Sequence, residues 1–172
     1  MMNLIVSVFA AGLLAALVPV AGAQSTSDQE EERKAIVRRV HDELFGNADT
    51  SVLDEYFAED YVEHDVAAGT LGREDLRRMY GSRGVKTTFP DLHNEIEALL
   101  YDDDQVVVRL TATGTMKGPM GDQAPTGRSF TLPVIVIYRF EGEQIVEAWR
   151  SYNVRSLRQQ IGSGLMFSGP VR

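Results

Sequence analysis

Cysteine is absent from all 172 residues of the sequence. Without it the chain has no disulfide, no thiolate ligand for a metal and no thiol nucleophile. Histidine is scarce as well, and the three histidines (His41, His64 and His93) lie far apart without the ligand spacing of a zinc site. The missing thiolates and the histidine spacing together argue against a metal site.

Positively charged residues are also fewer than negatively charged ones. Lysine and arginine together number 17 against 25 aspartates and glutamates, which gives a net charge of −8. Such an acidic chain is a poor partner for nucleic acid or for anionic membrane surfaces. Apolar residues make up 44% of the sequence, which argues against disorder, and the length suffices for one domain with a sizeable core.

Charged side chains are missing altogether from the first 23 residues. The segment from Leu4 to Val20 is almost continuously apolar and is followed by Ala21-Gly22-Ala23, the small-residue pattern of a signal-peptidase site. We predict that residues 1–23 are a signal peptide and that the protein is exported, periplasmic or secreted, with no membrane contact after cleavage. The alternative is an uncleaved anchor helix, since the apolar run is close to the minimum for spanning a bilayer.

The remaining chain divides into a linker and helix start (24–33), one domain (34–162) and a C-terminal tail (163–172). Apolar periodicity and turn residues predict the elements of this domain. Helices are expected at 27–45, 50–57 and 72–80, a short extended piece at 61–64, strands at 91–101, 105–116, 129–141 and 145–153, and a closing helix at 154–161. Helices that precede an antiparallel sheet indicate the α+β class. A long twisted sheet covered by helices on one face would form a cone with an apolar interior, a common ligand site.

The strand predicted at 145–153 matters most for function. One of its faces carries an acid, the single tryptophan, a hydroxyl and an amide. If this face lines a cavity it is a binding wall; if it faces solvent or a partner chain it is a polar strand face. We expect the first arrangement, with the indole and the amide facing the cavity. Strand alternation places Glu147, Trp149, Ser151 and Asn153 on this face, and Ala148, Arg150 and Tyr152 on the other.

Two histidines are interpreted differently. His64 stands at a strand end beside a loop, where functional groups gather, although a surface histidine paired with Asp60 or Asp65 fits the same pattern. His41 lies within the apolar stripe of the first predicted helix and is expected to be a satisfied group at the edge of the core.

Several short motifs occur in a fixed order between about residues 34 and 162. They are Phe89-Pro90-Asp91-Leu92, the run 109–115 (RLTATGT), Pro125-Thr126-Gly127-Arg128, Tyr138-Arg139-Phe140, Ile145-Val146-Glu147-x-Trp149 and Leu157-x-x-Gln160-x-Gly162. In these motifs the chain resembles the SnoaL-like polyketide cyclases, also called ester cyclases. They belong to the nuclear transport factor 2-like superfamily, which also contains ketosteroid isomerase and limonene epoxide hydrolase.

The resemblance implies a cone-shaped, curved antiparallel sheet wrapped by N-terminal helices, with an interior pocket and a homodimer formed through the sheet. For true cyclases it implies an intramolecular aldol ring closure that needs neither metal nor cofactor. A carboxylate abstracts the proton next to a carbonyl, and polar groups hold the enolate oxygen.

The chain departs from the cyclase pattern at the positions that carry the chemistry. The family's base is an aspartate four residues after the strand tryptophan, and here that position is Asn153, whose amide cannot take the proton at neutral pH. Met116 and Ala148 stand where the family often has histidine. One matching histidine is kept, His64 in the Tyr61-Val62-x-His64 segment.

Three hypotheses stay open at this point. In the first, the protein is an exported enzyme acting on a small apolar carbonyl, ester or lactone compound. His64 would be the general base, oriented by Asp91 or Glu147. The candidates for binding and polarising the substrate are Asn153, Trp149 and Arg139, with Met116 and the orienting acids Glu147 and Asp91 also counted among the substrate-binding residues.

In the second hypothesis, the chain is a non-catalytic module that binds a small hydrophobic molecule in a degenerate cyclase site. In the third, it is a homodimeric interaction module that uses the outer face of the sheet. An epoxide hydrolase is also compatible with the fold; it would need two acids around an arginine, for which Arg139 is the candidate.

Overall fold

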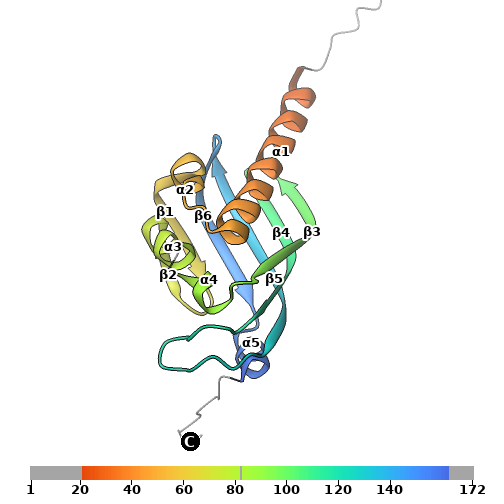
Figure 1. Cartoon of the computed structure of the whole chain (residues 1–172). Helices are drawn as coiled ribbons and strands as arrows, with labels where there is room; N and C mark the ends of the chain where they lie inside the picture. Colours follow the sequence, from red (N-terminus) through yellow and green to blue (C-terminus); the bar gives the residue numbers. More distant parts are fainter. Residues whose placement is uncertain (1–20, 82, 163–172) are drawn as a thin grey trace, which may run out of the picture.

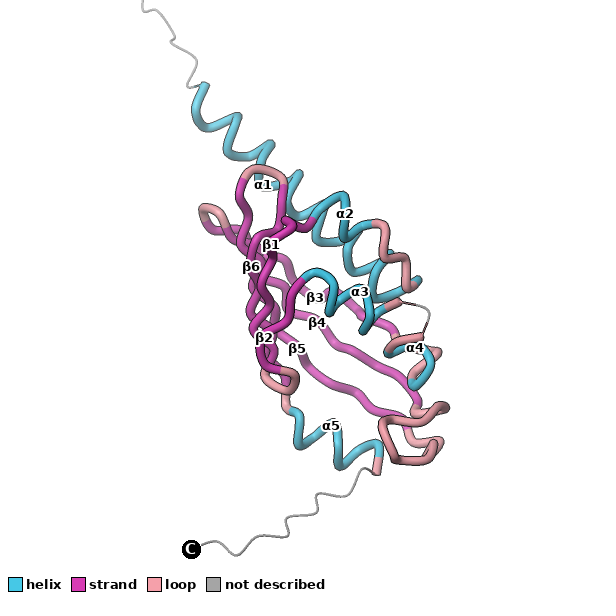
Figure 2. Tube along the Cα trace, turned by 90° about the vertical axis from the view of Figure 1, so that its left-hand side faces the viewer, coloured by secondary structure: helices cyan, strands magenta, loops and turns pink. Residues whose placement is uncertain are grey.

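The computed structural model describes residues 21–81 and 83–162, which form an α+β fold with helices over one face of a curved six-stranded sheet (Figures 1 and 2). The predicted α+β class is confirmed. Nearly all of the predicted signal peptide and the whole predicted tail (163–172) lie outside the described residues. None of the described helices is long and apolar enough to span a membrane.

The helical layer begins with α1 (Ala21–Val40), which continues into a π-helical turn, η1 (His41–Gly46). The apolar stripe predicted on this helix is buried: Val37, Val40 and Leu44 have no exposed surface. Three short helices follow: α2 (Val52–Tyr56), α3 (Arg73–Tyr80) and α4 (Val85–Thr88). The last helix, α5 (Val154–Ile161), ends at Gly162, whose φ of +75° is the left-handed conformation that glycine adopts without a Cβ clash.

Six strands make the sheet, in the spatial order β2-β1-β6-β5-β4-β3. Their bounds are β1 (Phe57–Asp65), β2 (Gly69–Gly72), β3 (His93–Asp102), β4 (Gln105–Thr115), β5 (Ser129–Glu141) and β6 (Gln144–Tyr152). Neighbours pair antiparallel except β1 and β6, which are parallel. The sheet is therefore mixed, which corrects the expectation of a purely antiparallel one.

The segment predicted as a short extended piece at 61–64 is a full strand, and the helix predicted at 50–57 is correspondingly shorter. The start of β1 is hard to recognise from the sequence, because the adjacent exposed acids Glu59 and Asp60 interrupt the alternation of buried and exposed residues. The pairing with β6 also shifts register between Phe57 and Val62. Strand periodicity assumes an unbroken ladder, so it finds only the last part of β1.

The inner face of the sheet is formed by alternate residues of β4 and β5. Val106, Val108 and Leu110 lie directly opposite Tyr138, Val136 and Val134, and all six are buried. The sequence alone left open whether these six residues lie on the inner or the outer face of the sheet. They are buried against the helices, so they belong to the inner face.

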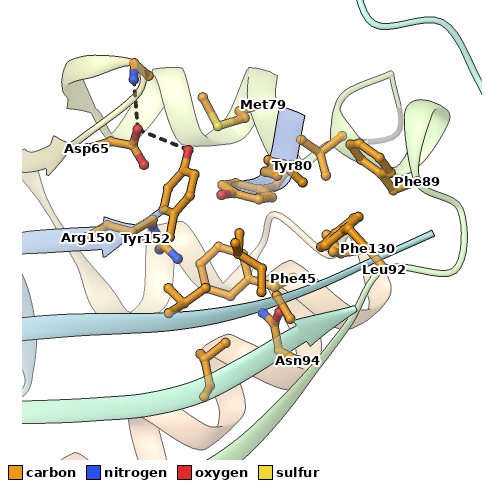
Figure 3. Close-up of a pocket in the computed structure, with 17 residues that line it drawn as sticks. Phe45, Asp65, Met79, Tyr80, Phe89, Leu92, Asn94, Phe130, Arg150 and Tyr152 are labelled. Carbon is orange, nitrogen blue, oxygen red and sulfur yellow. Dashed lines mark hydrogen bonds between the residues drawn. The ribbon is translucent and has the colours of Figure 1, made fainter. Parts of the chain in front are cut away.

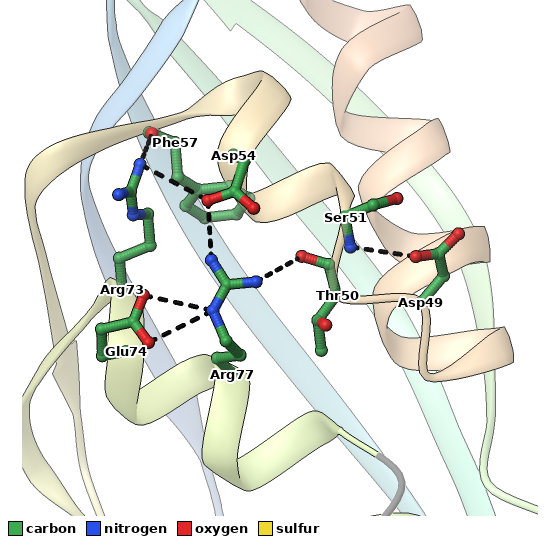
Figure 4. A network of polar contacts seen from close by, with 8 residues as sticks. All are labelled: Asp49, Thr50, Ser51, Asp54, Phe57, Arg73, Glu74 and Arg77. Atoms are coloured by element: carbon green, nitrogen blue, oxygen red, sulfur yellow. Dashed lines mark hydrogen bonds and ion pairs between the residues drawn. The ribbon is translucent and has the colours of Figure 1, made fainter.

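Two arginines of α3 hold this helix against α2, the loop before α2 and the start of β1 (Figure 4). Arg77 donates to the Asp54 carboxylate at 2.7 Å and to the Thr50 carbonyl at 3.1 Å. Arg73 donates to the Phe57 carbonyl at 3.2 Å. These contacts set the position of the C-terminal end of α3, which carries Met79 and Tyr80.

His41 is buried between the helical layer and the sheet, as its place in the apolar stripe indicates. Its Nε2 lies 3.1 Å from the Tyr138 hydroxyl, and its Nδ1 lies 3.5 Å from Nδ2 of Asn94. Burial, reinforced by the positive charge of Arg150, lowers the pKa of His41 to about 3. The imidazole is therefore neutral in the folded protein over the whole range in which an unfolded histidine titrates.

Because of this lowered pKa, we expect acid to destabilise the protein at pH values well above those at which carboxylates titrate. Below an unfolded pKa of about 6.5, the unfolded chain takes up a proton that the folded chain does not. The free energy of unfolding should then fall by up to about 1.4 kcal/mol for each pH unit. Urea unfolding between pH 7.5 and 5 measures the slope, and His41→Gln should remove most of it.

The matched control for this prediction is His93→Gln, because His93 is exposed on β3. It should keep the wild-type slope. A wild-type stability that is flat between pH 7 and 5 would contradict the account of His41.

Candidate active site

A cavity of about 170 Å³ lies between the inner face of the sheet and helices α3 and α4 (Figure 3). Its two ends differ in chemistry. Phe89, Leu92 and Phe130 form an apolar end, and Asp65, Arg150 and Tyr152 lie at the opposite, polar end. Such a cavity can hold the apolar body of a ligand and offer directed polar groups to one part of it.

The polar end depends on the parallel pairing of β1 with β6. This register sets Asp65 beside Arg150 and Glu63 beside Ala148. Nε of Arg150 donates to Oε1 of Glu63 at 2.6 Å, and Oε2 of Glu63 accepts from the Tyr61 hydroxyl at 2.8 Å. Only 8% of the Arg150 side chain and 2% of the Glu63 side chain are exposed.

Arg150 also lies against an aromatic ring, with its guanidinium carbon 4.9 Å from the centre of Phe45. Burial alone would lower the pKa of Arg150, but the charge of Glu63 more than offsets this and raises the pKa above its ordinary value. The guanidinium therefore stays charged inside the protein.

Asp65 ends β1 and turns the chain into the next loop. Its Oδ1 accepts from the backbone N–H groups of Ala67 and Ala68 at 2.7 and 2.8 Å, and from the Tyr152 hydroxyl at 3.5 Å. All of these bonds use one oxygen. Oδ2 makes no hydrogen bond to the described residues, which leaves one carboxylate oxygen at the cavity with its lone pairs available.

Two tyrosine hydroxyls complete the polar end. Burial raises the pKa of Tyr152, and the charge of Asp65 raises it further. Burial likewise raises the pKa of Tyr80 to about 12. Both phenols are therefore donors at neutral pH, and the Tyr80 hydroxyl points toward the polar end in Figure 3. Tyr80 is itself held by Phe45, with the two rings edge to face at 4.6 Å.

Four of the residues predicted as site residues lie together, but on the outer face of the sheet. His64 Nε2 is 2.9 Å from Glu147 Oε1, and Arg139 Nε donates to Glu147 Oε2 at 3.1 Å. The His64 ring stacks on Trp149, with ring centres 5.6 Å apart. The hydrogen bond from His64, together with Arg139, lowers the pKa of Glu147. This group lies outside the lining of the cavity.

The expectation that the Trp149 face of β6 lines the cavity is wrong. The alternation was predicted correctly, but Arg150 and Tyr152 on the opposite face line the cavity, and Ala148 is buried on that side. A tryptophan is usually placed inside and an arginine outside on hydrophobicity alone. Here the carboxylate of Glu63 on β1 neutralises the buried charge of Arg150, and no local sequence pattern predicts that the two residues pair.

The other three predicted site residues have separate structural positions. Asn153 caps α5, where its side-chain oxygen accepts from the Ser156 N–H at 2.9 Å. Asp91 accepts from the Thr115 N–H at 2.8 Å and pairs with Lys117 at 3.3 Å. The backbone bond to Thr115 is the main cause that lowers the pKa of Asp91 to about 2. Met116 is fully buried. The catalytic and substrate-binding roles of the seven residues stay predictions.

The sequence interpretation missed Asp65, Arg150, Tyr152 and Tyr80. Asp65 had a usable signal, since it follows His64 at the same strand end, where it was considered only as a partner for that histidine. Among the described residues, no group of three or more histidines, aspartates or glutamates is placed to hold a metal ion.

Comparison with known structures finds the same fold repeatedly. AclR from Streptomyces galilaeus is 25% identical with a TM-score of 0.67, and the match covers 78% of this chain and 98% of that chain. TsrD from Streptomyces laurentii is 22% identical with a TM-score of 0.68, covering 78% and 97%. A protein of ketosteroid isomerase-like fold from Catenulispora acidiphila, solved in complex with trimethylamine, is 25% identical with a TM-score of 0.61, covering 74% and 92%.

The search of curated proteins gives no match. The family model of the SnoaL-like polyketide cyclases matches residues 35–161, which is most of the chain and nearly the whole predicted domain. The chain is a member of the SnoaL-like polyketide cyclase family.

Proposed function

We propose that this SnoaL-like domain binds one small, mostly apolar carbonyl compound in the cavity and transfers a proton at it, with Asp65 as the general base. The observation that carries the proposal is that Oδ2 of Asp65, at the polar end of a largely apolar cavity, accepts no hydrogen bond from the described residues. A carboxylate base and fixed donors for a developing oxyanion are what proton abstraction next to a carbonyl needs. The phenol of Tyr80 and the guanidinium of Arg150 supply those donors, while the Tyr152 hydroxyl donates to Oδ1 of Asp65.

The size of the cavity narrows the class of ligand. Its volume of about 170 Å³ is close to that of a cavity of about 150 Å³ that accommodates benzene. The volume favours a molecule with one ring, or a short branched chain, over a fused multi-ring compound.

The base sits in a different place from the family pattern. Asn153 occupies the position of the usual aspartate and serves as a helix cap, and an asparagine is among the most favourable residues there. His64, the base predicted from the sequence, has Nε2 bonded to Glu147 on the outer face. The carboxylate that lines the cavity is Asp65 of β1, so we assign the role to it.

The test is exchange of the protons next to the carbonyl of cyclohexanone in D₂O, followed by NMR. Wild-type protein should accelerate exchange, and Asp65→Asn should slow the protein-dependent rate by about 100-fold or more, the usual contribution of a general base. Asparagine keeps an Oδ1 acceptor for Ala67 and Ala68, so the turn should survive. Asp102→Asn, at an exposed carboxylate at the end of β3 and outside the cavity lining, is the matched control and should leave the rate unchanged.

Full activity in Asp65→Asn would reject Asp65 as the base. A wild-type protein that binds the ketone without exchanging its protons would instead favour the non-catalytic binding module.

We further infer that the protein forms a homodimer through the outer face of the sheet. Leu100, Val107, Ile137 and Trp149 are register partners on consecutive strands, which makes a continuous apolar row. Ile135 lies on the same face and is 48% exposed, and Leu100 is 64% exposed. A contiguous apolar strip on an otherwise polar face is typical of an association surface.

Light scattering at micromolar concentration should give the mass of a dimer. Ile135→Lys introduces a charge beside the row and should weaken association by about tenfold or more, as at the centre of other interfaces. Thr131→Lys, at an exposed position on the same strand and face, is the control and should remain dimeric. A wild-type protein that is monomeric under these conditions would contradict the proposal.

We also propose export with cleavage after Ala23, supported by the uncharged apolar segment and the small residues at its end. Expression of the full-length chain in a bacterial host, followed by fractionation and intact mass measurement, should yield a soluble chain that begins at Gln24. A full-length chain recovered with the membranes would favour the uncleaved anchor.

A further inference from the structure

Arg150 has more hydrogen-bonding capacity than the fold uses. Nε is bonded to Glu63, whereas Nη2 is buried without a hydrogen bond of ordinary geometry among the described residues, and the Tyr138 hydroxyl is the protein group that interacts with this side of the guanidinium. A buried charged donor without an acceptor is unfavourable, and native proteins seldom leave one unexplained. The side chain also forms part of the cavity wall, so a molecule in the cavity lies against the guanidinium, although Nη2 itself has almost no accessible surface without a ligand.

The guanidinium is held in place before any ligand arrives. Glu63 fixes Nε, Tyr61 fixes Glu63, and the ring of Phe45 supports the guanidinium plane. Donors that are already oriented lose little freedom on binding, and they favour ligands that match their geometry. Figure 3 shows the guanidinium beside Tyr152 and Phe45, at the end opposite Phe89 and Phe130.

The charges around this donor decide what kind of acceptor fits. Arg150 is the one cationic side chain that lines the cavity within the described part of the chain, and Asp65 is the one carboxylate. Glu63, directly behind Arg150, adds a second negative charge. His41 adds no positive charge, since its pKa of about 3 keeps it neutral. With two carboxylates and one guanidinium, this end of the cavity repels an added anion.

We propose that Arg150 is the oxygen-binding subsite of the cavity and that it selects an uncharged oxygen acceptor over both a hydrocarbon and a carboxylate. The acceptor is a ketone, ester, lactone or ether oxygen, and the apolar body of the ligand lies against Phe89, Leu92 and Phe130. This inference rests on the binding part of the proposed function but not on proton transfer by Asp65.

Three probes of matched shape test the selectivity: cyclohexanone, methylenecyclohexane, which replaces the oxygen by a CH₂ group, and cyclohexanecarboxylate. Dissociation constants from NMR titration of wild-type protein should show cyclohexanone binding about tenfold or more tighter than methylenecyclohexane, as a hydrogen bond to a charged group provides. Cyclohexanecarboxylate should bind more weakly than cyclohexanone.

The variant that isolates the subsite is Glu63→Gln/Arg150→Met. Arg150→Met alone would leave Glu63 charged and buried without its partner and could unfold the domain, whereas removing both charges avoids that penalty. In the double variant the preference for cyclohexanone over methylenecyclohexane should disappear, and the affinity for methylenecyclohexane should stay within about twofold of wild type. Arg109→Met, at an exposed arginine of β4 that pairs with Glu97 on the outer face, is the matched control and should keep the preference.

Equal binding of the ketone and the hydrocarbon by wild-type protein would overturn the subsite, because Arg150 would then be satisfied without the ligand. A preference that survives in the double variant, or tightest binding of the carboxylate, would overturn it as well. Failure of all three probes to bind would overturn the cavity-binding proposal itself, which distinguishes the two failures.

Discussion

The buried ion pair between Glu63 and Arg150 is the interaction on which the candidate site depends. It joins β1 to β6 across the one parallel pairing of the described sheet, with a 2.6 Å hydrogen bond in a region almost closed to solvent. Removing one partner of such a pair typically costs about 3–5 kcal/mol, because the other charge is left buried. The same pairing brings Asp65 to the cavity and directs Arg150 inward, so the fold and the site share one constraint.

Local sequence patterns predicted the parts of the molecule that local physics determines. The β-branched runs of β4 and β5 alternate strictly between the two faces, and both strands were placed within a residue or two. The α5 helix was placed at its observed bounds because Gly162 provides a clear stop. Periodicity and turn residues also predicted most of the order of the elements, and a long twisted sheet covered by helices indicated an apolar interior. The family resemblance then implied the same interior pocket.

The candidate site was not predictable in the same way, because its decisive contact joins residues 87 positions apart. Considered alone, a strand with adjacent Trp149 and Arg150 is expected to bury the tryptophan and expose the arginine. The buried carboxylate of Glu63 on β1 makes the opposite orientation stable. The strand β1 is itself hard to recognise from the sequence, because it contains two exposed acids and a register shift. As a result, the two faces of β6 have distinct assignments: the inner face contributes to the cavity, and the outer face carries Trp149 in an apolar row.

The central claim is that the ligand site lies on the inner face of the sheet and not on the face that carries the single tryptophan. A two-dimensional ¹H–¹⁵N NMR titration with cyclohexanone tests it directly, because Trp149 gives the only indole N–H resonance of the protein. The account predicts saturable shifts of the amides of Leu132, Val134 and Tyr152, which line the cavity, and an unmoved indole resonance. Saturable movement of the indole signal with unchanged cavity amides would contradict it.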